Sequence, residues 1–236
     1  MILYRYISAL VTCFIILTVI AQLPSVQAWA GGPAPNPMPK NAEHYQFSYN
    51  IKRDGALIGS YHFDVRKGRD SYSFDAELAI DVSVFGFSVY ELKHRRNEEW
   101  RNGKLVSLEG RSVYDGDERY NIKLERGTGQ TYRLQVNGNT QHLKERVVSF
   151  SPRQPDNWKE AKLISLKGNA DAVMKNKLES TQLTVNGKRH KAAHYRLEGD
   201  VIRDLWYDAN GRLLKLSYKK DGATITFVRK RVAPGK

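Results

Sequence analysis

Residues 71–84 read SYSFDAELAIDVSV, and polar and apolar side chains alternate along the whole stretch. Even-numbered positions such as Phe74 and Leu78 are apolar, whereas odd-numbered positions include Asp75 and Glu77. A period of two places successive side chains on opposite faces of an extended chain. The stretch therefore predicts a long β-strand with one face in a core and the other in water.

Seven Asn-Gly or Asp-Gly dipeptides divide the chain on both sides of this strand. These residues tolerate the positive φ angles of tight hairpin turns, so each dipeptide predicts a strand that reverses onto its neighbour. They lie at residues 54–55, 102–103, 115–116, 137–138, 186–187, 210–211 and 221–222. The spacing predicts one all-β domain over residues 44–231, an antiparallel meander of about 12–13 strands.

The size of this meander decides whether the sheet is open or rolled. Twelve strands would present on the order of 1,700 Å² of apolar surface per face, far more than the roughly 300–600 Å² patch of a typical monomer. The sheet is therefore expected to form a barrel, half-barrel or curved sheet with its apolar positions inside. Because a roll of more than eight strands can exceed what its side chains fill, a hydrophobic cavity is also expected.

The segment over residues 152–177 departs from the strand pattern. Asp156 or Asn157 could cap a short helix that continues through Leu163. This is the one helical connection that the sequence predicts. It carries Trp158 and would form a lid over the mouth of the rolled sheet.

The first 28 residues predict a secretory signal peptide. Arg5 precedes an apolar run from about residue 7 to residue 23, and small residues lead to Ala28. An uncleaved anchor is the alternative, because the run is just long enough to span a bilayer. Cys13, the one cysteine, lies inside this run, so the mature chain has no disulfide and fits a bacterial periplasm.

Two further segments lie outside the predicted domain. Residues 29–43 carry four prolines at alternate positions and predict an extended linker. Residues 232–236 form a short basic tail.

The segment WYDANGRLLKL at residues 206–216 carries a resemblance to a known class of families. Together with Tyr49-Asn50-Ile51 and Ile58-Gly59, it resembles bacterial secreted all-β proteins catalogued as domains of unknown function. The resemblance covers most of residues 44–231. It implies an all-β fold, and it supplies no catalytic or binding residue.

Residues capable of catalysis or metal binding form no recognisable motif. His190 and His194 would share a face on a helix, but on a strand they lie about 13 Å apart. Asp75, Glu77 and Asp81 are best explained as solvated charge on the polar face of a strand. We therefore expect no metal, no cofactor and no enzyme activity, with a hydrolase as a remote alternative.

The charge of the chain favours anionic partners. The net charge is +13, and removal of residues 1–28 leaves +12 because Arg5 is their one charged residue. A basic periplasmic protein would lie close to an anionic membrane surface or another envelope component, whereas a secreted chain rarely meets nucleic acid. The alternative is that distributed lysines keep the sheet soluble. The candidate contacts are Arg95, Arg96, Lys188, Arg189, Lys191, Lys219 and Lys220.

Three functions fit these features. The first is an envelope protein that holds a lipid or other apolar molecule inside the rolled sheet. The second is a structural or interaction module with a fully packed core, and the third is an outer-membrane β-barrel. For the first function, the predicted ligand-lining residues are Tyr61, Phe63, Phe74, Leu78, Ile80, Phe87, Trp158 and Trp206.

Overall fold

The structure is a computed structural model that describes residues 43–150, 152 and 159–230. All of these residues belong to the compact unit formed by residues 38–236. The predicted signal peptide, nearly all of the linker, the basic tail and Trp158 lie outside the described residues.

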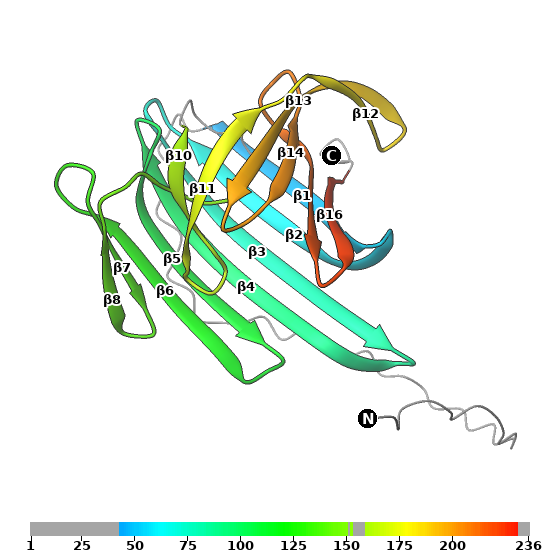
Figure 1. The fold of residues 1–236 in the computed structure, drawn as a ribbon, viewed down its shortest axis with the longest axis horizontal. Helices are drawn as coiled ribbons and strands as arrows, with labels where there is room; N and C mark the ends of the chain where they lie inside the picture. Colours follow the sequence, from blue (N-terminus) through cyan, green and yellow to red (C-terminus); the bar gives the residue numbers. More distant parts are fainter. Residues whose placement is uncertain (1–42, 151, 153–158, 231–236) are drawn as a thin grey trace, which may run out of the picture. The chain divides into compact units, whose positions relative to one another are not determined.

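Sixteen strands and no helix are found in this described part of the chain (Figure 1). Accordingly, it contains no helix that could cross a membrane. The strands are β1 (Glu43–Arg53), β2 (Ala56–Lys67), β3 (Ser71–Val84), β4 (Phe87–Arg101), β5 (Lys104–Tyr114), β6 (Glu118–Arg126), β7 (Tyr132–Val136), β8 (Asn139–Leu143), β9 (Val147–Val148), β10 (Glu160–Ile164), β11 (Ala170–Lys177), β12 (Thr181–Val185), β13 (Lys188–Gly199), β14 (Arg203–Tyr207), β15 (Leu213–Lys220) and β16 (Ala223–Arg229).

The strands form one sheet that rolls into a nearly closed barrel, which confirms the predicted all-β class. Its order is β8-β7-β6-β5-β4-β3-β2-β1-β16-β15-β14-β13-β11-β10-β9, so β1 pairs with β16. Most neighbours in the sheet are also neighbours in sequence, as a meander requires. The exceptions are the pairs β1–β16 and β11–β13; β12 pairs with β13 beside this order, and β9 runs parallel to β10.

The alternation along β3 has the predicted effect on burial. Phe74, Ala76, Leu78 and Ile80 are buried in the main core, whereas the odd-numbered positions from Glu77 to Asp81 are exposed. The neighbouring strands follow the same rule, so their apolar side chains fill the inside of the barrel.

The predicted turns also form, with one difference. Six of the seven dipeptides have positive φ at both residues, the geometry of type I′ hairpins. In the seventh, only Gly211 has positive φ, at 68°. There the Asp208 carboxylate accepts hydrogen bonds from the backbone N–H groups of Asn210 and Arg212, both at 2.9 Å, and these bonds hold the loop.

An eighth turn of the same kind joins β3 to β4. Phe85 and Gly86 have φ angles of 51° and 85°. The sequence has no Asn-Gly or Asp-Gly signal for this turn, and phenylalanine rarely adopts positive φ. This conformation costs a residue with a Cβ roughly 1–2 kcal/mol.

The predicted helical connection is wrong for the residues that the structure describes. Residues 160–164 form β10, which pairs with β9 on one side and β11 on the other. Pairing on both sides satisfies the backbone and buries Ala161, Leu163 and Ile164. The number of strands exceeds the predicted 12–13 because short strands such as the two-residue β9 show no readable alternation.

One connection runs across the inside of the barrel. We call residues 147–150 together with Pro152 the crossing segment. It starts with β9, which contacts β5, and it reaches β15, where the Pro152 carbonyl accepts a hydrogen bond of 2.8 Å from Leu213 N–H. Between these points, the Phe150 ring lies 5.8 Å from Tyr61 and 6.1 Å from Phe227, measured between ring centres. The crossing segment therefore fills one half of the barrel.

Candidate functional site

The other half of the barrel contains a cavity of about 820 Å³. Its mouth is formed by the hairpin turns β1–β2, β10–β11, β13–β14 and β15–β16, and its walls come from the inward faces of β3, β4 and β16. These walls are mainly apolar. They carry Leu78, Ile80, Val82, Tyr90, Leu92, Ile225 and Phe227.

The crossing segment closes the inner end of this cavity. Phe227 lines the cavity and also packs against Phe150, whose ring lies 6.0 Å from Phe63. Tyr61 and Phe63 are buried on the far side of this contact. The cavity is therefore a pocket with one open end and not a channel through the barrel.

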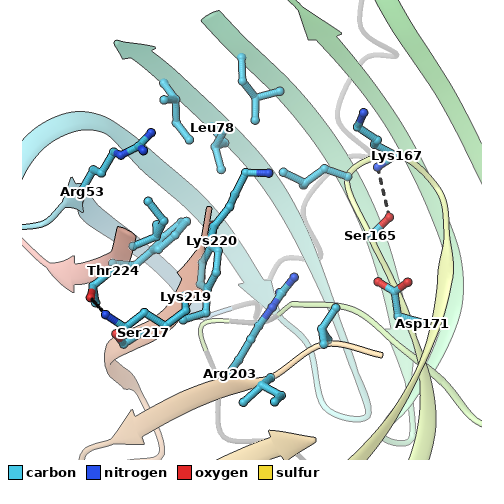
Figure 2. Close-up of a pocket in the computed structure, with 18 of the residues that line it drawn as sticks. Arg53, Leu78, Ser165, Lys167, Asp171, Arg203, Ser217, Lys219, Lys220 and Thr224 are labelled. Carbon is cyan, nitrogen blue, oxygen red and sulfur yellow. Dashed lines mark hydrogen bonds between the residues drawn. The ribbon is translucent and has the colours of Figure 1, made fainter. Parts of the chain in front are cut away.

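Cationic side chains surround the mouth (Figure 2). Arg53 comes from the end of β1, Lys167 from the β10–β11 loop, and Lys219 and Lys220 from the end of β15. The Lys219 Nζ donates a hydrogen bond of 2.7 Å to the hydroxyl of Thr224. The positive charge of these four side chains favours an anionic group at the mouth.

Arg203 extends from β14 into the cavity (Figure 2) and is half-buried, whereas Lys167, Lys219 and Lys220 are exposed. Its guanidinium carbon lies 5.5 Å from the centre of the Tyr218 ring. Within residues 43–150, 152 and 159–230, this guanidinium has no ion pair or hydrogen bond. Burial lowers the pKa of Arg203, while Tyr218 and then Asp171 favour its charged form. Arg203 is thus a charged group in an apolar pocket, and its N–H groups are available to donate hydrogen bonds to a ligand.

The Asp171 carboxyl also faces the cavity, from β11 (Figure 2). Burial raises its pKa, although the charge of Arg203 acts in the opposite direction. The two side chains make no ion pair within 4 Å in the described structure. Arg203 is therefore not neutralised by a bonded carboxylate.

A second arginine lies at the closed end, where it forms an ion pair and two hydrogen bonds. Arg96 Nε lies 2.7 Å from Glu98 Oε1, and Arg96 also donates to the Phe150 carbonyl at 2.8 Å. Glu98 Oε2 accepts hydrogen bonds from Trp100 at 2.7 Å and Ser149 at 2.6 Å. This network joins β4 to the crossing segment. The prediction that Arg96 contacts an anionic surface is wrong, because its side chain is buried.

His94 is buried in the wall and packs against the loop after β10. Its Nδ1 lies 2.7 Å from Ser112 Oγ, and Ser112 donates to the Leu166 carbonyl. Burial, followed by the nearby charge of Arg96, lowers the pKa of His94 to about 3. His94 is therefore neutral at physiological pH and anchors a loop of the cavity mouth.

The described ligand-lining candidates are distributed over four regions. Leu78 and Ile80 line the cavity, whereas Tyr61, Phe63 and Phe74 are buried in the core but are not among the residues that line it. The prediction is wrong for Phe87, whose side chain is 76% exposed beyond the end of the barrel.

The prediction is also wrong for Trp206, which lies on the outer face. Its ring stacks on His194 at 4.5 Å and lies beneath the Lys215 ammonium at 4.9 Å. There β12 covers a small second cluster that includes Leu214, so Leu213 and Leu214 are buried on opposite sides of the sheet. Simple alternation could not reveal this second cover.

The predicted anion contacts do not form one surface. Besides the buried Arg96, Lys219 and Lys220 lie at the cavity mouth, Arg95 lies on the outer face beside Glu77 at 3.1 Å, and the other three candidates are on the β12–β13 hairpin. Lys188, Arg189 and Lys191 of that hairpin are exposed.

Sequence reasoning missed Arg53, Lys167 and Arg203. A signal for Arg203 was present, because it shares the strand face of Leu205 and Tyr207, both of which are buried. The described residues contain no group of three or more His, Cys, Asp or Glu side chains that could hold a metal.

The fold and the cavity together define an all-β, nearly closed barrel with a pocket open at one end. The chain belongs to a family described as a domain of unknown function (DUF6134), whose model matches residues 49–230. The crystal structure of a beta-barrel-like protein of the domain of unknown function DUF1849 from Brucella abortus is similar, with a TM-score of 0.57 and 10% identity. The match covers 80% of this chain and 96% of that one, and it shows a shared fold. A search of curated proteins finds no match.

Proposed function

We propose that this protein binds a lipid or another elongated apolar molecule that carries an acidic group. The observation that supports this function most directly is the apolar cavity of about 820 Å³ with the unpaired guanidinium of Arg203 inside it. Pockets for small ligands typically measure about 300–1,000 Å³ and combine apolar walls with a few polar groups.

The two parts of the ligand follow from the two parts of the pocket. The walls formed by Leu78, Ile80 and Leu92 would remove a hydrocarbon chain from water, which stabilises the complex by about 25 cal/mol per Å² of buried apolar surface. Arg203 would bind a carboxylate or phosphate oxygen pair, because its donors form a planar fork that matches such groups.

We further propose that the protein works outside the cytoplasm, in the bacterial cell envelope. Support comes from residues 1–28, with their apolar run and small residues before Ala28, and from a single cysteine confined to that segment. The membranes of the envelope would supply ligands of the proposed chemistry. N-terminal sequencing of the protein recovered from its own cells tests this location, and a chain that keeps residues 1–28 in the cytoplasm would contradict it.

The decisive experiment for the ligand is native mass spectrometry, with organic extraction, of protein purified gently from its own envelope. We expect a near-stoichiometric acidic amphiphile. An apo mass would contradict tight ligand binding and would favour the alternative, an interaction module of the envelope.

Two variants link the ligand to the cavity. Arg203→Met retains apolar bulk but removes the anion-binding group, and we expect at least tenfold weaker binding of a fluorescent fatty-acid probe. Arg189→Met, on the exposed β12–β13 hairpin, is the matched control and should bind the probe as the unmodified protein does. Equal loss in both variants would show that general charge, and not the cavity, holds the probe.

A further inference from the structure

The β3–β4 hairpin projects beyond the rest of the barrel. The pairing of β2 with β3 ends at Ile80, and the last backbone contact of β4 with the β5 side is at Glu91, so residues 82–90 pair only within their own hairpin. At about 3.4 Å per residue, the projection is on the order of 15 Å. Figure 1 shows the two strands reaching past their neighbours.

The end of this hairpin is apolar and uncharged. Residues 82–90 read VSVFGFSVY and contain no charged side chain. Phe85 is 97% exposed and Phe87 is 76% exposed, and Val84 and Val89 are also exposed. We call residues 84–89 the apolar tip.

The backbone of the apolar tip is strained, because Phe85 is the one residue other than Asn, Asp or Gly that has positive φ in the described part of the chain. Phe85 occupies the first position of a type I′ turn with φ of 51°. Six other turns of this type have Asn or Asp at that position. These two residues adopt positive φ far more easily than phenylalanine does. A bulky aromatic residue held in an unfavourable conformation, with its side chain in water, points to a functional role for that side chain.

The exposed apolar residues gather at the same end of the barrel as the cavity mouth. Of the eight large hydrophobic residues that are exposed in the described part of the chain, six lie there. Leu57 follows the β1–β2 turn, Ile202 precedes β14 and lines the cavity, and the other four belong to the apolar tip. Val82 and Tyr90 line the cavity and continue directly into the tip.

From these observations we propose that the apolar tip inserts into the surface of a phospholipid bilayer, with the cavity mouth facing that surface. A narrow two-stranded ribbon offers a protein partner little area, whereas standard protein interfaces bury about 800 Å² on each side. Exposed aromatic and aliphatic side chains without charge suit the boundary between lipid headgroups and acyl chains. The contact differs from the ligand site, because no residue of the tip lines the cavity.

The test is flotation of the mature protein with vesicles of phosphatidylcholine and phosphatidylethanolamine. The key variant is Phe85→Asn, which removes the aromatic ring and creates the Asn-Gly turn that the other hairpins already use. Because this change relieves backbone strain, a loss of binding cannot be attributed to unfolding. We expect binding to these vesicles, and about tenfold weaker binding for Phe85→Asn.

The matched control is Met174→Ser, which removes an exposed apolar side chain of β11 that lies away from the tip. It should bind vesicles like the unmodified protein. Absence of vesicle binding, or equal binding by Phe85→Asn, would overturn the proposal. Self-association in analytical ultracentrifugation that Phe85→Asn abolishes would also overturn it, because the tip would then contact a second copy.

The outcome is separable from that of the proposed function. Phe85→Asn should bind the soluble fatty-acid probe like the unmodified protein, since the cavity is unchanged. Loss of vesicle binding with full probe binding supports the membrane contact whether or not a natural ligand is found.

Discussion

The two ends of the barrel interior are formed by the same strands, but one is filled by side chains and the other contains a cavity. At the closed end, the crossing segment brings Ser149 and Phe150 against β4 and β16, where Ser149 bonds to Glu98 and the Phe150 carbonyl bonds to Arg96. At the open end none of the described residues crosses, and a cavity of about 820 Å³ is left between the same walls. Alternation of side chains makes an apolar interior, but a connection from elsewhere in the chain decides which part of it is filled.

The two inward-facing arginines express this difference most clearly. Arg96 at the closed end is bound to Glu98, Tyr61 and the Phe150 carbonyl. Arg203 at the open end lies beside the ring of Tyr218, and its guanidinium makes no ion pair or hydrogen bond with another described residue. The buried ion pair joins parts of the fold, whereas an unpaired guanidinium in a pocket is available to bind a ligand.

The largest effect on stability should come from breaking the pair at the closed end. Glu98→Leu leaves Arg96 buried without a counter-charge, and we expect the free energy of unfolding to fall by about 3–5 kcal/mol in urea titrations. The double variant Arg96→Met with Glu98→Leu should recover most of this loss. If the single variant is as stable as the unmodified protein, the crossing segment is not held by this network.

A smaller effect is expected from the pH dependence of His94. Its pKa is about 3 in the folded protein, against about 6.5 when unfolded. Above pH 6.5 neither state binds the proton, whereas between pH 6.5 and 3 only the unfolded chain does, so stability falls as the pH falls. By pH 5 the loss should be on the order of 2 kcal/mol. Denaturant titrations of His94→Gln should lack this loss, and the exposed His142→Gln should retain it.

Phe85→Asn should stabilise the hairpin at the open end. Replacing a strained phenylalanine by asparagine at φ of 51° should raise the free energy of unfolding by about 1 kcal/mol. Thermal unfolding followed by circular dichroism measures the change. A lower melting temperature would mean that the Phe85 ring packs against the barrel and is not free in water.

The smallest effect on stability is expected at the unpaired arginine. Arg203→Met should change the free energy of unfolding by less than about 0.5 kcal/mol, because no ion pair is lost among the described residues. Together with the Glu98→Leu result, urea titration of this variant sharpens the contrast between the two ends. A large loss on Arg203→Met would show that Arg203 also holds the wall together.

Local features of the sequence were sufficient to predict much of this fold. The alternation around Phe74 and Leu78 and the Asn-Gly and Asp-Gly turns depend on neighbouring residues alone. The crossing segment, the β1–β16 pairing and the outer cover over Trp206 depend on contacts between distant parts of the chain. For that reason the sequence analysis predicted Arg96 as a surface contact, although it is buried, and did not identify Arg203 as a residue of the cavity.

The pairing of Tyr49 with Arg229 has a consequence for how the chain is made. Among the described strands, β1 emerges first from the ribosome and β16 emerges last. One edge of β1 therefore stays unpaired until β16 has been synthesised. Contacts between such distant segments form slowly, and an unpaired edge readily captures a strand from another chain. A nascent chain that stalls before residue 223 therefore has no closed barrel to adopt, and its correct assembly depends on the strand that is made last.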